Sequence, residues 1–253
     1  MLLSLACLLA APASEAVYKV KKKPEKPVFA NPQEERTYRL RHGEIMTEGG
    51  YLDHGVRGRM EGMIPAPPEV VWDLFIQSNH WKRYGMPAIQ DSRAVNQEIV
   101  DQVGSAKSIN VFYKIAGNLM MDPIADRKKG GFWTNLVFQV YDIPWPLADR
   151  WMIVKTNYDE SKISKAIYRA EWTRLAGNVR TVDGWMVLEP FEGDRHLTRM
   201  EYQADSDPGI SIPKFILRWG LKKTMPGVIQ AIRREAIRVY GRPPASGEDG
   251  PSS

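Results

Sequence analysis

The chain has 253 residues, enough for one large domain with a substantial core or for two small ones, and its 43% hydrophobic and 26% charged residues are globular composition. The single cysteine, Cys7, excludes an internal disulfide and a cysteine metal site. The net charge of +5 fits either simple solvation or contact with an anionic surface, and no recognition helix, zinc-finger spacing or aromatic RNA-binding motif points to nucleic acid.

Residues 1–16 resemble a secretory signal peptide. An apolar start too short to span a bilayer ends in the small-residue triplets Ala11-Pro12-Ala13 and Ser14-Glu15-Ala16, although no positive residue precedes it. We expect cleavage after Ala13 or Ala16 and a periplasmic or secreted protein. Residues 17–36 interleave lysines with prolines, which disfavours packing and predicts a linker.

Two short helices are expected early in the folded part. Pro67 and Pro68 suit the first turn of a helix and Glu69 favours its N-terminus, and a second helix is expected at 80–84. A turn is expected at Gly49-Gly50. Strands are predicted at 37–40, 44–47, 56–64, 92–97, 105–115, 136–141 and 151–154.

Apolar and polar residues then alternate with a period of two. Ala166, Tyr168, Ala170 and Trp172 share one face, while their immediate neighbours are mostly polar. The same alternation recurs at Met200-to-Ala204. Such patterning in successive segments predicts an antiparallel sheet with one wet and one dry face.

A long helix is expected at 213–240, followed by a disordered tail at 242–253. Pro213 opens it, and Pro226 removes a backbone donor and should kink or divide it. Strands followed by one long helix indicate the α+β class. The apolar positions predicted for one face of this helix are Phe215, Ile216, Trp219, Met225, Ile229, Ile232, Ala236 and Val239.

The sequence contains few signals of catalysis. Its four histidines lack i,i+4 pairing, and HExxH, Walker A, GxGxxG and GxSxG motifs are all absent. This pattern favours binding over chemistry, and no cofactor or metal is expected.

Four blocks of sequence carry a resemblance to a known family. Residues 56–84 resemble the opening of SRPBCC (START/polyketide cyclase/birch-allergen-like) domains. Pro144-Trp145-Pro146-Leu147-Ala148-Asp149-Arg150 is similar to the Pro-Trp-Pro-Leu-Ser-Asp-Arg motif of START lipid-transfer domains. Residues 184–190 and 207–215 are similar to that family's Gly-Trp strand and to the start of its C-terminal helix. The blocks follow family order.

This resemblance implies a helix-grip fold over residues 37–241, in which a curved antiparallel sheet wraps around the long C-terminal α-helix and leaves a ligand cavity between them. Arg150 is expected either to pair within its turn or to serve a polar headgroup at the cavity mouth. Trp145 is expected to plug a corner, near the ligand. The ligand-binding residues so predicted are Trp145, Arg150, Met152, Val154, Tyr168, Trp172, Met186, Met200, Tyr202, Phe215, Ile216 and Trp219.

The function that we expect is lipid binding: a monomer carries or sequesters a hydrophobic small molecule or lipid in the cell envelope, with transient contact to an anionic membrane and no nucleic acid partner. Two alternatives stay open. One is an enzyme of the aromatase/cyclase branch, which would use inward polar groups such as Arg150, Tyr168 or Tyr202. The other is a structural or interaction module whose core is filled.

Overall fold

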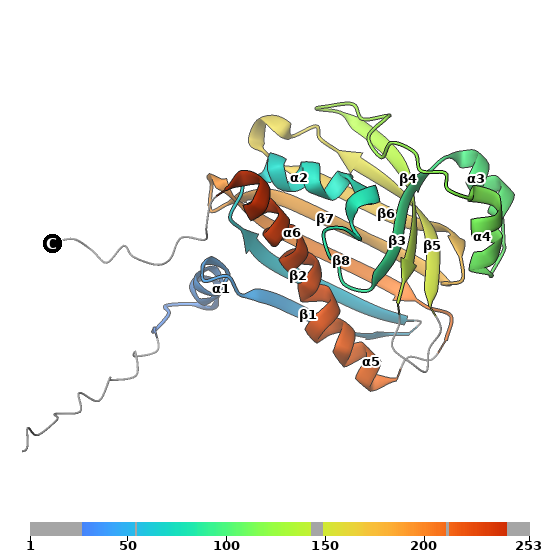
Figure 1. Ribbon diagram of the computed structural model, residues 1–253. Helices are drawn as coiled ribbons and strands as arrows, with labels where there is room; N and C mark the ends of the chain where they lie inside the picture. Colours follow the sequence, from blue (N-terminus) through green and yellow to red (C-terminus); the bar gives the residue numbers. More distant parts are fainter. Residues whose placement is uncertain (1–26, 54, 143–148, 211–212, 242–253) are drawn as a thin grey trace, which may run out of the picture.

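The computed structural model describes residues 27–53, 55–142, 149–210 and 213–241. Within these residues one antiparallel sheet dominates the fold, with the strand order β1-β2-β8-β7-β6-β5-β4-β3 (Figure 1). The chain crosses from β2 on one side of the sheet to β3 at the far edge before it builds the strands between them. The strands are β1 (Ile45–Leu52), β2 (Gly55–Ile64), β3 (Ile89–Val95), β4 (Phe132–Tyr141), β5 (Arg150–Asp159), β6 (Tyr168–Gly177), β7 (Thr181–Phe191) and β8 (Asp194–Asp207).

Helices cover both faces of the sheet and create two hydrophobic cores. On the face that we call the inner face, α2 and α6 pack over the larger core (Figure 1). On the opposite face, α3 and α4 pack over a second core made with β3 to β6. No described helix is both long and apolar enough to cross a bilayer. The helical elements are α1 (Pro32–Arg41), α2 (Pro68–Ile76), η1 (Ser78–His80), α3 (Gln97–Val103), α4 (Ile109–Ala116), η2 (Ile163–Lys165), α5 (Lys214–Trp219), η3 (Gly220–Thr224) and α6 (Met225–Tyr240).

Close contact between α6 and the sheet depends on a glycine in β2. A Cβ atom added at Gly62 would lie 2.9 Å from Cγ2 of Ile229, so a larger residue would push the helix outward. Register shifts in the β3–β4, β5–β6 and β7–β8 pairs add bends to the strands. The bent sheet and the long helix form the predicted helix-grip arrangement, which is confirmed.

Several sequence expectations are confirmed at the level of elements. The strand expected at 56–64 is β2, and the helix expected after Pro67 is α2, whose buried residues include Val71 and Trp72. The strands expected at 136–141 and 151–154 lie within the longer β4 and β5. In β6 the predicted inward residues Tyr168, Ala170 and Trp172 are more buried than the residues between them, as the period-two pattern requires. In β8 the same holds for Met200, while Tyr202 and Ala204 are half-buried like their neighbours.

The strand expected at 37–40 is wrong, because helix α1 occupies this segment and begins inside the predicted linker. The side chain of Asn31 caps the helix by accepting a hydrogen bond from the Glu34 backbone N–H at 2.9 Å. Pro32 starts the helix, and Leu40 is buried in a small core with Phe191. Gly49 and Gly50 lie inside β1 and do not form the expected turn.

The strand expected at 105–115 is also wrong. Within this segment Ser108 caps helix α4 by accepting a hydrogen bond from the Asn110 backbone N–H at 3.3 Å. Phe112 and Ala116, one turn apart, are buried against the sheet, and the Phe112 ring stacks on Phe138 at 3.5 Å between centroids. The helix expected at 80–84 is instead the short η1 followed by turns.

The C-terminal helix runs from α5 through α6 in one direction (Figure 1). Its hydrogen bonding changes to a π-helical pattern in η3, and Pro226 lies in the first turn of α6, where a missing backbone donor is tolerated. Ile229, Ile232 and Ala236 are buried as predicted. Val239 is 55% exposed, so its assignment to the apolar face is wrong.

Candidate functional site: an apolar cavity between sheet and helix

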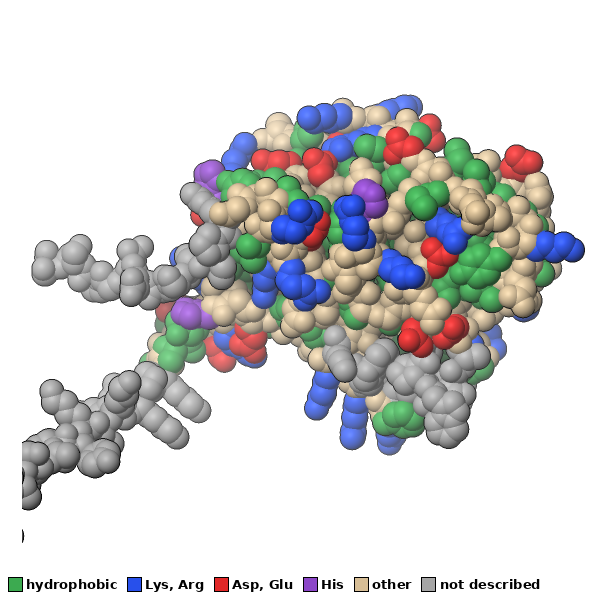
Figure 2. Space-filling view, viewed as in Figure 1, with side chains coloured by type: hydrophobic (Ala, Val, Ile, Leu, Met, Phe, Trp, Pro, Cys, Tyr) green, Lys and Arg blue, Asp and Glu red, His purple; other side chains and the backbone are tan. Residues whose placement is uncertain are grey.

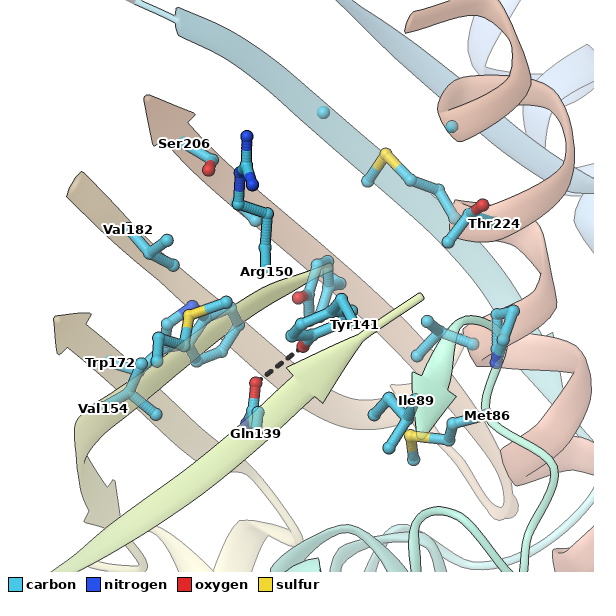
Figure 3. Close-up of a pocket in the computed structure, with 18 of the residues that line it drawn as sticks. Met86, Ile89, Gln139, Tyr141, Arg150, Val154, Trp172, Val182, Ser206 and Thr224 are labelled. Atoms are coloured by element: carbon cyan, nitrogen blue, oxygen red, sulfur yellow. Dashed lines mark hydrogen bonds between the residues drawn. The ribbon is translucent and has the colours of Figure 1, made fainter. Parts of the chain in front are cut away.

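A cavity of about 330 Å³ lies between the inner face of the sheet and the C-terminal helix. Strands β2 and β4 to β8 provide its floor and walls, and η3 and α6 cover it with Gly220, Thr224, Met225 and Val228. Figure 3 shows side chains from both layers converging on this space. The volume is within the range of small-molecule sites in proteins, about 300–1,000 Å³.

A row of small residues across three strands makes room for this space. Gly58 of β2 is paired with Ala204 of β8, which is paired with Gly184 of β7. Gly58 and Ala204 line the cavity directly. Since these positions lack larger side chains, the sheet does not fill the space beneath the helix.

Trp172 depends on the third member of this row. It is the register partner of Gly184, and a Cβ atom there would lie 2.4 Å from Cζ2 of the indole. The glycine therefore lets the indole lie across β7 and serve as a cavity wall. The Trp172 ring also contacts the Tyr202 ring, with 5.0 Å between centroids.

The polar side chains that line the cavity are arginines and tryptophans, which only donate hydrogen bonds, and hydroxyl and amide groups, which both donate and accept. The hydroxyl of Tyr141 donates a hydrogen bond to Oε1 of Gln139, with 2.6 Å between the oxygen atoms (Figure 3). Burial raises the pKa of Tyr202 to about 12 and raises the pKa of Tyr141 above its ordinary value of 10. Both hydroxyls therefore stay protonated and uncharged at neutral pH. Arg150, directly opposite Tyr141 in the β4–β5 pair, places a cation at the cavity lining.

The described lining residues include no Asp, Glu, His or Cys. Across the described part of the chain, no group of three such residues is placed to hold a metal ion. The arrangement can enclose an apolar body and offer donors to its polar atoms. Within these residues it provides no carboxylate or imidazole that could act as a general base.

Of the residues predicted to bind ligand, five come together at the cavity: Arg150, Met152, Val154, Trp172 and Tyr202. Three others lie on the same face but within the solid core: Tyr168, Met186 and Met200. Tyr168 stacks on the Trp72 ring at 5.2 Å between centroids, which explains its burial away from the cavity. Trp145, and the side chains of Ile216 and Trp219, lie outside the described residues.

Phe215 is placed wrongly by the sequence prediction. Its side chain is 58% exposed and does not reach the cavity. The helix turns a later face to the cavity, with Gly220, Thr224 and Val228 at four-residue spacing. The π-helical segment adds residues to one turn and so shifts this face relative to α5, which a constant helical period does not anticipate.

Gln139 and Thr156 line the cavity but are not among the predicted ligand-binding residues. Gln139 is 6% exposed and lies between the inward-facing Val137 and Tyr141 on β4. Thr156 is 4% exposed and lies beside Trp172 in the β5–β6 pair. The alternation of β4 contains a signal that identifies Gln139 as a cavity residue, since this polar residue falls on the apolar, inward-facing side of the strand.

A second buried polar cluster lies outside the cavity, around the carboxylate of Glu160. Oε1 accepts hydrogen bonds from the indole N–H of Trp72 at 2.7 Å, from that of Trp133 at 3.3 Å and from Nε of Arg127 at 2.8 Å. Burial by itself would raise the pKa of Glu160, but the bonds from Trp72 and Arg127 outweigh it and leave this pKa below its ordinary value. The cluster fastens α2 to the loop after β5.

Comparison with known proteins shows likeness at the level of structure. No family model matches the sequence, and no curated protein matches it. A STAR-related lipid transfer protein fragment from Xanthomonas axonopodis is similar in fold, with 15% identity, a TM-score of 0.52, and coverage of 76% of this chain and 93% of that one.

Two further solved structures are similar at lower scores. An aromatase/cyclase from a Streptomyces species has 12% identity and a TM-score of 0.47, over 81% of this chain and 99% of that one. The human StAR-related lipid transfer protein 5 has 9% identity and a TM-score of 0.46, over 82% of this chain and 94% of that one. At these identities the comparisons bear on the fold alone.

Proposed function

We propose that this chain, which has a START-like helix-grip fold of the SRPBCC kind, binds a hydrophobic small molecule of the lipid class in its cavity and carries or sequesters it. The observation that carries the proposal is the cavity itself, which is enclosed by Met, Val and aromatic side chains where a solid core would be filled. Transfer of apolar surface out of water supplies the driving force, roughly 25 cal/mol per Å² buried.

An aromatase/cyclase enzyme is the second candidate, because Arg150, Tyr141 and Tyr202 place polar groups in the same cavity. The raised pKa values of Tyr141 and Tyr202 argue against these hydroxyls as bases at neutral pH. Binding without turnover is therefore the function that the geometry supports better.

We further propose transient contact with anionic membrane through α5 and η3. Lys214, Arg218 and Lys222 are exposed at four-residue spacing, and the exposed Phe215 lies beside them. Figure 2 shows basic side chains projecting from the molecule where α5 lies. The proposed location, the periplasm or the exterior, rests on residues 1–16, which are outside the described residues.

The test uses N-phenyl-1-naphthylamine, a neutral apolar dye whose fluorescence rises in dry surroundings. We expect the wild-type chain to bind it, and Trp172→Arg to weaken binding about tenfold or more, because a cation placed in the cavity loses its hydration. Glu171→Arg is the matched control: the adjacent side chain lies on the exposed face, so affinity should be kept.

Native mass spectrometry of the protein from its own host gives an independent measurement. A co-purifying lipid supports the proposal. Failure of the wild-type chain to bind the dye, together with the absence of any bound lipid, would show that the cavity is not a ligand site.

A further inference from the structure

The charged side chains that line the cavity are all of one sign. Two arginines, Arg57 and Arg150, line it, and no carboxylate does so among the described residues. Arg57 is neutralised by Asp205, to which its Nε donates at 2.8 Å. A ligand cation would lose its hydration here without meeting a counter-charge, whereas an oxygen acceptor would meet donors.

Gln139 is the donor best placed inside. Its side chain is more than nine-tenths buried, lies on the inner face of β4 and opens to the cavity (Figure 3). A carboxamide carries one acceptor oxygen and two N–H donors. Among the described residues the oxygen accepts from Tyr141, and the nitrogen has no hydrogen-bond partner.

Tyr141 determines which end of the amide meets the ligand. Because burial keeps its hydroxyl protonated, this hydroxyl donates to Oε1 and turns the N–H₂ group away from itself. The N–H₂ group opens to the cavity, where an oxygen atom of a ligand would be able to accept a hydrogen bond from it. Tyr141 is thus a positioning residue and Gln139 the group that would touch the ligand.

We propose that Gln139 determines ligand specificity by donating to an oxygen of the ligand, so that the cavity selects an apolar molecule with a carbonyl or carboxylate group and rejects one with an ammonium group. The inference rests on the proposed function and adds the chemistry of the ligand's polar end.

The experiment displaces N-phenyl-1-naphthylamine with three amphiphiles of equal chain length: dodecan-2-one, dodecanoic acid and dodecylamine. The dye carries no oxygen acceptor, so its own affinity reports the apolar cavity alone. The ketone and the acid distinguish a neutral carbonyl from a carboxylate, whose charge Arg150 would also favour. Circular dichroism and thermal unfolding confirm that each variant keeps its fold.

In Gln139→Leu, the affinity for the ketone should fall about fivefold to tenfold, with dye affinity kept within about twofold, since one hydrogen bond is lost. In Gln139→Glu, the preference for the acid over the amine should reverse. The acid should bind more weakly and the amine more tightly than in wild type, because the carboxylate presents acceptors in place of the N–H donors. Tyr141→Phe should lower ketone affinity by a smaller factor, because the amide is no longer held in one orientation.

Gln203→Leu is the matched control, since Gln203 lies next to Tyr202 but faces the opposite side of β8. It should leave all three affinities unchanged. One outcome would overturn the inference while leaving the proposed function intact. In that outcome the wild type, Gln139→Leu and Gln139→Glu all bind the dye and all show the same preference for the ketone over the amine. Absence of dye binding by the wild-type chain, together with the absence of any co-purifying lipid, would overturn both.

Discussion

Glu160 shows how single residues hold this fold together. Its carboxylate is fully buried, and indole and guanidinium groups from three separate segments surround it. Arg127 also donates to Asp73 of α2 at 2.8 Å. Helix α2 is therefore linked to Glu160 in two ways, directly through Trp72 and indirectly through Asp73 and Arg127. The cost of burying the charge is offset by hydrogen bonds to the charged form.

We therefore predict that Glu160→Gln lowers the free energy of unfolding by about 2 kcal/mol at neutral pH, because hydrogen bonds to a charged group are replaced by weaker ones. The pKa of Glu160 is lowered by folding, so its contribution is complete above the ordinary value of 4.5 and is lost as the pH falls through the lower folded value. The difference between wild type and variant should therefore narrow in acid, as measured by urea unfolding.

The control for this residue is Glu171→Gln. Glu171 pairs with Arg169 on the solvent face, where both side chains are about half exposed. Such surface pairs contribute little, about 0.5 kcal/mol or less. Equal losses in the two variants, or a Glu160→Gln loss that does not change with pH, would contradict the role assigned to the buried carboxylate.

At the scale of elements, the C-terminal helix has two tasks. Its α6 part packs on β2 and α2, and Arg233 anchors it by donating to the backbone carbonyl oxygens of Met63 and Gly43. The long Arg233 side chain thus reaches from the helix to the sheet and to the turn before β1. The preceding α5 and η3 segments instead present exposed basic groups, and η3 also covers part of the cavity.

We predict that the triple variant Lys214→Gln, Arg218→Gln, Lys222→Gln binds vesicles of phosphatidylcholine and phosphatidylglycerol more weakly than wild type. Each basic residue near an anionic surface contributes roughly 1 kcal/mol, so losing three should cost about two orders of magnitude in affinity at low salt. Vesicle co-sedimentation measures this, and binding to pure phosphatidylcholine should change little.

The matched control removes the same net charge elsewhere, with Lys129→Gln, Lys162→Gln and Lys165→Gln, all exposed near the loop between β5 and β6. This triple variant should keep most of the vesicle binding. If both triple variants lose it equally, the molecule responds to net charge and α5 is not a docking face.

At the scale of the whole molecule, the remaining proposal concerns location. The chain starts with an apolar segment that ends in two small-residue triplets, and the net charge of +5 suits an anionic envelope surface. We predict that protein recovered from the envelope or medium of its own host begins at Ser14 or Val17. N-terminal sequencing and intact mass check this. Intact residues 1–13 on cytoplasmic protein would contradict export and would favour the cyclase alternative.

Much of the architecture could be read from local patterns. The alternation around Trp172 and Tyr202 predicted the inner face of the sheet, and the prolines before α2 predicted its first turn, because both signals act over a few residues. Helices α1 and α4 were missed although Asn31 and Ser108 mark their starts. There, the capping side chains are the local signal that distinguishes a helix from a strand.

The sequence by itself determined the inward direction of residues such as Trp172 and Tyr202 and the long C-terminal helix, since side-chain direction follows from backbone period. Both Trp172 and Tyr168 face inward, but only the tertiary structure shows that Trp172 lines the cavity while Tyr168 is buried in the solid core. That difference arises because Gly58, Ala204 and Gly184, distant in the chain, align across three strands, and because Trp72 packs on Tyr168. Packing between distant segments depends on register and helix rotation, which local periodicity does not contain.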